Sequence, residues 1–229
     1  MDKEYAQYLQ ERNKEGYNKI ADDFSQTRSI KRKELEQFNR FVKRGDFLLD
    51  IGCGNGRLID SLKEKEISYI GIDSSPRLIE IAQQKYPHSR FVTGDIFKVV
   101  FPSETFNGVF AISLLHHIPS FPLQLRLLKE AARVLRPNGL LFLTVWQIPL
   151  SFSRFGKPSF LRQRLAKKPS LGKRDFIHQW GGQTNLYYHA FTQKELKKLI
   201  RGINLSIVDS GRMTNASGSR KNLYLIAQK

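Results

Sequence analysis

The sequence predicts an α/β fold: a doubly wound, mostly parallel seven-stranded sheet with an antiparallel C-terminal hairpin. Short apolar runs alternate with helical stretches over residues 45–146, which indicates parallel strands joined by right-handed crossovers. A glycine-rich turn follows the first apolar run, as at the nucleotide sites of open α/β sheets. Near the end, 203–210 and 222–227 are strand-like and are joined by a Gly/Ser/Asn-rich stretch, which predicts the hairpin.

The remaining elements follow from periodicity and from start and stop signals. The five core strands are expected at 47–51, 69–72, 91–93, 109–113 and 140–146. Helices are expected at 4–20, 31–44, 57–65, after Ser75, at 123–134 and at 194–201. Ser75 is a good N-cap with Pro76 in the tolerated first position, and Pro137-Asn138-Gly139 should stop the helix before it.

Composition and charge restrict the class of protein. The chain has 229 residues with 40% hydrophobic side chains, enough for a sizeable core in one large domain or a domain with an insertion. The single cysteine and the charged N-terminus favour a cytoplasmic protein without disulfides, structural zinc, a secretory signal or a membrane span. The formal net charge of +17 favours polyanionic partners, without choosing between RNA, DNA and an anionic surface.

The glycine-rich turn is unlike a phosphate-binding loop. Its glycines stand at 52, 54 and 56 and Arg57 follows, so neither the dinucleotide spacing nor a Gly-Lys-Ser/Thr sequence is present. Asp50 ends the first strand and Asp73 ends the second. Two carboxylates suit a ligand with a cation and a ribose but no phosphate. The alternative is a structural Gly-rich turn with a nearby acid, which many doubly wound proteins contain.

Four segments in order resemble the motifs of class I S-adenosylmethionine-dependent methyltransferases, whose fold is Rossmann-like. They are 49–56 (LDIGCGNG), 71–75 (GIDSS), 93–96 (TGDI) and 133–139 (RVLRPNG). The resemblance implies S-adenosylmethionine as cofactor, with Asp50 at its amino end, Asp73 on both ribose hydroxyls, and Asp95 with the Ile96 amide at the adenine. The full set of implied cofactor-binding residues is Asp50, Gly52, Cys53, Gly54, Asp73, Ser74, Asp95 and Ile96. Cys53 is expected to be a small residue of the turn rather than a nucleophile.

The flanking segments resemble one group, the tRNA wobble-uridine carboxymethyl methyltransferases. The similar segments are 17–28 (YNKIADDFSQTR), 116–118 (HHI), 145–146 (VW) and 187–196 (YYHAFTQKEL). Asn107 departs from the family, which has Asp there, and residues 147–186 do not match cleanly. The resemblance implies methyl esterification of a tRNA carboxymethyl group, and a small zinc-binding activator subunit as a partner.

Several side chains are candidates for the acceptor end of such a site. A carboxylate is ionised at neutral pH, so it needs positioning rather than a strong base. Arg28, His116 and His189 are the catalytic candidates, and Trp146 and Tyr188 could stack on a base. Phosphate contacts are expected from the basic residues Arg162, Arg164, Lys167 and Lys168. The structural alternatives are an ion pair for Arg28, hydrogen bonds to loop backbone for His116, packing for Trp146 and a solvated loop for the basic residues.

These expectations divide the chain into four parts. Residues 1–44 form an N-terminal helical cap segment, 45–146 the donor-binding core, 147–190 a substrate-recognition insertion, and 191–229 the C-terminal helix and hairpin that complete the sheet. The leading function is an RNA-binding methyltransferase in tRNA processing. The alternatives are a small-molecule O- or C-methyltransferase for a quinone, lipid or carboxylic acid precursor, and a non-catalytic donor-binding RNA module.

Overall fold

The computed structural model describes residues 1–28, 32–62, 65–148, 171–215, 218 and 221–229. Its main sheet has seven strands in the order β3-β2-β1-β4-β5-β9-β8. The strands are β1 Phe47–Ile51, β2 Ser68–Asp73, β3 Arg90–Thr93, β4 Phe106–Ile112, β5 Leu135–Trp146, β8 Ser206–Thr214 and β9 Lys221–Gln228. The first five strands are parallel, and β9 is antiparallel to both β5 and β8. The predicted fold class and terminal hairpin are confirmed.

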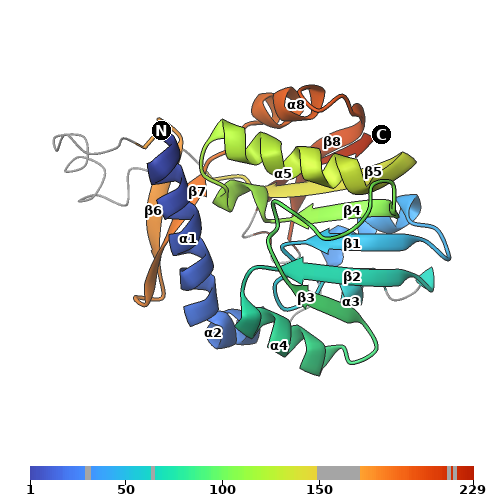
Figure 1. Ribbon diagram of the computed structural model, residues 1–229, viewed down its shortest axis with the longest axis horizontal. Helices are drawn as coiled ribbons and strands as arrows, with labels where there is room; N and C mark the ends of the chain where they lie inside the picture. The colour runs from blue at the N-terminus through green and yellow to red at the C-terminus, as the bar shows by residue number, and fades with distance from the viewer. Residues whose placement is uncertain (29–31, 63–64, 149–170, 216–217, 219–220) are drawn as a thin grey trace.

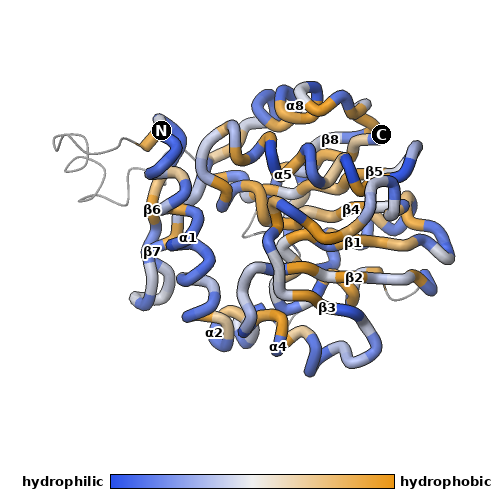
Figure 2. The backbone as a smooth tube through the Cα atoms, in the orientation of Figure 1, coloured by the Kyte–Doolittle hydropathy of each residue, from blue (hydrophilic) through white to orange (hydrophobic). Residues whose placement is uncertain are grey.

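Helices cover both faces of this sheet (Figure 1). They are α1 Lys3–Lys19, α2 Ala21–Gln26, η1 Lys33–Phe41, α3 Ile59–Leu62, α4 Pro76–Lys85, η3 Leu115–His117, α5 Phe121–Val134 and α8 Gln193–Arg201. Helices α5 and α8 bury residues such as Leu127 and Leu196 in one core cluster. The 3₁₀ helix η1 and helix α4 bury Phe38 and Ile79 in the other. The strands between them are therefore apolar along most of their length, as Figure 2 shows by colour.

The structure differs from the sequence prediction in the type of one helix and in the bounds of several elements. The segment expected to be helical over 31–44 contains a 3₁₀ helix instead, and α3 is only four residues long. Helix α5 ends at Val134 as predicted, but β5 begins at Leu135 rather than at residue 140. Arg136 precedes Pro137 and therefore avoids helical backbone, so the helix has to end before it, and Leu135 is already extended. Ser75 caps α4 as predicted, accepting a hydrogen bond from the Leu78 amide.

A second hairpin lies in the segment expected only as an insertion. It consists of β6 (Asp175–Trp180) and β7 (Thr184–His189), paired in an antiparallel register. Helix α1 packs on β7 so closely that a Cβ on Gly16 would lie 2.7 Å from the Leu186 side chain. Without a side chain at that position, the helix can approach the strand. The α1–hairpin unit, as we call α1 with β6 and β7, stands beside the carboxyl ends of β1, β2 and β4 (Figure 1).

Candidate functional site

A cavity of about 880 Å³ opens where the strand tips meet α1 and α2. Its walls come from the tips of β1 to β5, from η3, from the N-terminal helices and from the segment that enters η1. The lining residues on which the argument depends are Tyr17, Arg28, Arg32, Asp50, Gly54, Asp73, Asp95, His117, Trp146 and Asn222. The carboxyl edge of a doubly wound sheet is the usual place for a ligand in this fold.

The turn after β1 needs its glycines for conformation and for space. Gly52, Gly54 and Gly56 have φ angles of +73°, +56° and +75°, a region that side chains disfavour. A Cβ on Gly52 would lie 2.7 Å from the Leu114 side chain, and one on Gly56 equally close to Phe91. A Cβ on Gly54 would meet only Phe24, at 3.7 Å. Gly54 therefore presents open backbone to the cavity, where a ligand can approach it closely.

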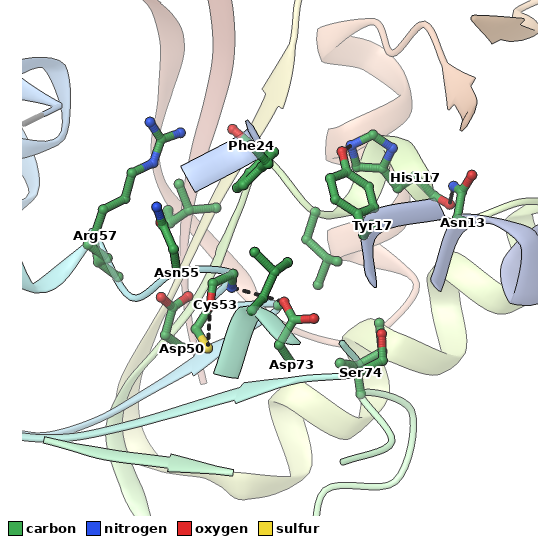
Figure 3. A pocket seen from close by; sticks show the side chains of 18 of the residues that line it. Asn13, Tyr17, Phe24, Asp50, Cys53, Asn55, Arg57, Asp73, Ser74 and His117 are labelled. Carbon is green, nitrogen blue, oxygen red and sulfur yellow. Dashed lines mark hydrogen bonds between the residues drawn. The ribbon is translucent and has the colours of Figure 1, made fainter. Parts of the chain in front are cut away.

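Asp73 at the end of β2 is fixed by the backbone around it. Its Oδ2 accepts a hydrogen bond from the Gly54 amide at 2.9 Å (Figure 3), and its Oδ1 accepts one from the Ser75 amide at 2.9 Å. Burial raises the pKa of this carboxyl group, and these amide hydrogen bonds oppose the shift. Each oxygen keeps a further lone pair, so the carboxylate can accept from two vicinal hydroxyls of a ribose. Ser74 lines the cavity beside it.

Asp50 at the end of β1 is buried and only half satisfied. Its Oδ2 accepts a hydrogen bond from the Tyr69 hydroxyl at 2.8 Å, whereas its Oδ1 has no partner among the described residues. Burial raises the pKa of this carboxyl group to about 7, against the opposing effect of the Tyr69 hydrogen bond. A buried acceptor without a donor is costly, and a cationic ligand would relieve that cost. The amino end of S-adenosylmethionine fits this oxygen.

The third strand tip supplies the remaining wall of the donor end. Asp95 and Ile96 both line the cavity, and the Asp95 Oδ1 is fixed by the Phe97 amide at 2.8 Å. Cys53 is buried in the turn, and burial keeps the pKa of its thiol well above the ordinary value. A protonated thiol is a poor nucleophile, which agrees with a space-filling role. The donor end thus combines three carboxylates with open glycine backbone.

The opposite side of the cavity carries aromatic and basic groups from α1, α2 and η3. The Tyr17 hydroxyl lies 2.7 Å from His117 Nε2 (Figure 3), and His117 Nδ1 lies 3.1 Å from the Tyr187 carbonyl. Because a carbonyl can only accept, Nδ1 carries the ring proton and Nε2 accepts from Tyr17. Burial lowers the pKa of His117 to about 4, so the ring is neutral. Arg28 is buried with its guanidinium 4.3 Å from the Phe24 ring centre.

The structure brings only some of the expected acceptor residues to the cavity. Arg28 and Trp146 line it, whereas His116, His189 and Tyr188 are not among its lining residues. His116 is fully buried and accepts a 3.4 Å hydrogen bond from the Trp146 amide at Nδ1. His189 Nδ1 lies 2.6 Å from Asp175 within the hairpin, and Tyr188 stacks on Phe176. The predicted phosphate-contacting residues Arg162, Arg164, Lys167 and Lys168 lie outside the described residues.

Several cavity residues were absent from the predicted site, among them Tyr17, His117, Arg32 and Asn222. Tyr17 and His117 lay within the family-like segments, but spacing gave no reason to pair residues so far apart in the chain. Arg32 directly precedes η1, and Asn222 lies near the start of β9. Nothing in the sequence around either residue indicates that it lines the cavity. Only the packing of the terminal hairpin brings Asn222 next to Trp146, with which it pairs in register.

The site agrees with comparisons with known proteins. A family model described as a methyltransferase domain matches residues 49–143, which hold the glycine turn, Asp73 and Asp95. A solved S-adenosylmethionine-dependent methyltransferase from Methanosarcina mazei covers 84% of this chain and is itself covered to 96%, with a TM-score of 0.70 at 23% identity. The chain carries a methyltransferase domain and is an S-adenosylmethionine-dependent methyltransferase. Its cofactor is S-adenosylmethionine.

Relatives of this methyltransferase among characterised proteins carry tRNA-related names. It is 29% identical to the tRNA (carboxymethyluridine(34)-5-O)-methyltransferase of Schizosaccharomyces pombe, over 93% of the chain and 94% of the relative. It is also 29% identical to the mouse (Mus musculus) enzyme of that name, ALKBH8, over 71% of the chain. The match spans only 23% of the mouse protein, so the chain corresponds to about a quarter of that relative.

A further fold neighbour was solved together with a second protein. It is the putative methyltransferase of Haloferax volcanii in complex with the Trm112 methyltransferase activator. That chain is 15% identical, with a TM-score of 0.67, and the match covers 93% of this chain and 96% of that one. At this identity the likeness concerns the fold. Within the described residues, no helix is both long and apolar enough to span a bilayer.

Proposed function

We propose that this methyltransferase esterifies the carboxymethyl group of a modified wobble uridine in tRNA. The similarity to the Schizosaccharomyces pombe relative, which extends along nearly all of both chains, is the observation that carries the proposal. The charge of the cavity supports it. Three carboxylates line the donor end, while the buried guanidinium of Arg28 and that of Arg32 lie in the wall as well. An acidic end suits a cationic donor, and basic groups suit an anionic acceptor.

The proposed methyl transfer requires the protein mainly to position the acceptor and the donor. Bound S-adenosylmethionine supplies an electrophilic methyl group, and its sulfur keeps the electron pair of the broken bond when the acceptor oxygen forms the new one. A carboxylic acid has a pKa near ~4, so the acceptor is ionised at neutral pH and no proton has to be removed. The protein must hold the oxygen in line with the methyl group and exclude water. The neutral Tyr17–His117 pair can shape this end of the cavity without adding a charge.

We propose that Arg28 and Trp146 contact the acceptor, with Trp146 offering a ring on which a base can stack. Trp146 ends β5 and lines the cavity, and single-stranded RNA is commonly read by such aromatic platforms. His116, Tyr188 and His189 would then act indirectly, by supporting Trp146 and the hairpin. The ring centres of Trp146 and Tyr188 are 5.6 Å apart, which gives the platform a rigid backing.

The direct test is incubation of the protein with labelled donor and total tRNA, followed by mass spectrometry of the nucleosides. The expected product is the methyl ester of carboxymethyluridine at the wobble position. Transfer to small phenols or carboxylic acids but not to tRNA would favour the small-molecule alternative. Donor binding without transfer to any RNA would favour the non-catalytic module. The Asp73→Ala variant is the matched negative control in each arm.

We also propose a small zinc-binding activator subunit as a partner and a cytoplasmic location, in keeping with the tRNA substrate. The Haloferax volcanii neighbour, which was solved in complex with the Trm112 methyltransferase activator, supports the first point. Co-expression with an activator of this type should raise the yield of folded protein and the transfer rate to tRNA. Equal yield and rate with and without it would contradict a need for the partner.

A further inference from the structure

The helices of this protein differ in the charge that they carry. Helices α1 and α2 carry four cationic and five anionic side chains, and η1, α3 and α4 carry four of each. Helices α5 and α8 carry seven cationic and two anionic side chains. Among the described helices, the excess of positive charge is therefore concentrated in the layer that α5 and α8 form on one face of the sheet (Figure 1).

Ion pairs neutralise most of the cations on the opposite face of the sheet. Three of the four cations of η1, α3 and α4 have an acidic partner within 4 Å. The pairs are Arg40 with Asp209, Arg77 with Asp22 and Lys85 with Asp60.

On α5 and α8 the pairing leaves the cations over. Glu130 is neutralised by Arg133 on the same helix, and Glu195 by Arg174 of the segment before β6. The other cations of the two helices form no ion pair with any residue that the structure describes. They are Arg126, Lys129, Lys194, Lys197, Lys198 and Arg201.

Three of these cations form a row along α8. Lys194, Lys198 and Arg201 are four and three residues apart, so they lie on one side of the helix. All three are exposed, as are Arg126 and Lys129 on α5. Like charges at this spacing destabilise a helix. A polyanion bound along the row would relieve that repulsion.

An exposed aromatic ring lies where this surface meets the carboxyl edge of the sheet. Phe121 begins α5 and is 44% exposed, and the Lys198 Nζ lies 5.4 Å from its ring centre. Ser120 before it has a φ of +70°, which is uncommon for a residue with a side chain. Phe121 follows Ile118, a residue of the cavity wall, by three positions. A base next to one that enters the cavity can therefore reach this ring.

We propose that the α5–α8 surface binds the RNA backbone beside the nucleotide that enters the cavity, and that Phe121 stacks on a neighbouring base. The α5–α8 surface consists of Phe121, Arg126, Lys129, Lys194, Lys198 and Arg201. Lysine and arginine side chains neutralise phosphates, and aromatic rings stack on unpaired bases. The assignment rests on the proposed function, which supplies tRNA as the polyanion, and deepens it by naming the face on which the tRNA lies.

The test measures the affinity for a tRNA transcript at several salt concentrations, with S-adenosylhomocysteine present. The triple variant Lys194→Gln/Lys198→Gln/Arg201→Gln should flatten the slope of log K against log salt by about 2–3, because each lost phosphate contact removes ~0.7–0.9. Near ~0.1 M salt its affinity should be at least about tenfold weaker than that of the wild type.

A matched triple variant removes the same charge elsewhere. Arg40→Gln/Lys85→Gln/Arg90→Gln changes three exposed cations of η1, α4 and β3, and should alter the slope by less than about 1. Phe121→Ala should weaken binding at least about fivefold with the slope unchanged, since it removes stacking and no charge. Phe121→Trp keeps an aromatic ring and should bind as the wild type does. Thermal melting confirms that each of these surface variants is folded.

The outcomes separate this assignment from the proposed function. Equal effects of the two triple variants, or no effect of either, overturn the α5–α8 surface as an RNA site. Unchanged affinity in Phe121→Ala overturns the stacking. If the α8 variant keeps its affinity for tRNA and loses that for an activator subunit, the surface belongs to a protein partner and the assignment also falls.

The methyl transfer itself is a separate readout. A wild type that binds tRNA through the α5–α8 surface but forms no methyl ester of carboxymethyluridine overturns the proposed function and leaves the surface assigned to RNA. A wild type without measurable affinity for tRNA at low salt overturns both.

Discussion

Asp50 and Asp73 are two carboxylates at neighbouring strand tips, and their surroundings give them different properties. Asp73 is satisfied by two backbone amides, whereas Asp50 has one hydroxyl donor and one oxygen that has no partner within the described part of the chain. Both groups are buried, so each depends on its few partners for the stability of its charge. Asp73 therefore holds the glycine turn in shape, whereas the Asp50 carboxyl group can accept a hydrogen bond from a cationic ligand.

Asp73→Ala should remove most of the affinity for S-adenosylmethionine, because the ribose loses a charged acceptor and Gly54 loses its anchor. The loss expected from two charge-assisted hydrogen bonds is at least about a hundredfold. Titration calorimetry measures it. Glu80→Gln, an exposed change on α4, is the control and should bind as the wild type does. Unchanged affinity in Asp73→Ala would contradict the placement of the ribose.

Asp50 should make stability and donor affinity respond to pH in opposite directions. Its folded pKa of about 7 is raised above the unfolded value. The stabilising contribution of the protonated group is therefore complete below the unfolded pKa and is lost as pH rises through 7. The cationic donor favours the ionised form, so its affinity should rise over the same interval.

The variant Asp50→Asn tests both halves of that expectation. Without ligand, it should gain stability relative to the wild type as pH rises from 5 to 8, by on the order of 3 kcal/mol. Its donor affinity should be weak and independent of pH. Thermal melts and calorimetry at several pH values check this, and a stability difference that stays constant with pH would contradict the raised pKa.

At the scale of elements, one asparagine joins α1 to the hairpin. The Asn13 Oδ1 accepts from the Tyr187 amide at 2.7 Å, and its Nδ2 donates to the carbonyls of Tyr187 at 3.2 Å and His117 at 2.9 Å. One side chain thus satisfies backbone groups of β7 and η3 while belonging to α1. Helix α1 forms one wall of the cavity, so this joint fixes that wall against β7 and η3.

Asn13→Ala should destabilise the protein by about 2–3 kcal/mol, since buried backbone groups lose their partners. Hydrogen exchange should show faster opening of β7 than of the central strands, because the loss is local. Glu15→Ala, an exposed change on the same helix, is the control and should shift stability by less than about 0.5 kcal/mol. Equal protection of β7 in both variants would argue against the joint.

At the scale of the whole molecule, the net charge of +17 should govern how the protein approaches the proposed tRNA substrate. Affinity should fall steeply between low and moderate salt, because bound lysines and arginines release counterions. Replacing Lys167 and Lys168 by Gln should flatten the slope of log K against log salt by about 1–2. The control pair Lys43→Gln/Arg136→Gln lies at the amino ends of β1 and β5, away from the cavity, and should leave the slope unchanged. A slope that both pairs change equally would assign the effect to general charge.

The sequence by itself determined the sheet and its terminal hairpin, and it supplied the residues proposed for the donor end. Each depends on neighbours in the chain: the periodicity of strands, the glycines that need positive φ, and the acids at strand tips. Only the tertiary structure decided which other residues line the cavity. Arg32, His117 and Asn222 come from three distant parts of the chain, and hydrogen bonds and strand pairing bring them to one cavity. The second hairpin was missed for the same reason, because it is held by α1, which lies more than 150 residues before it.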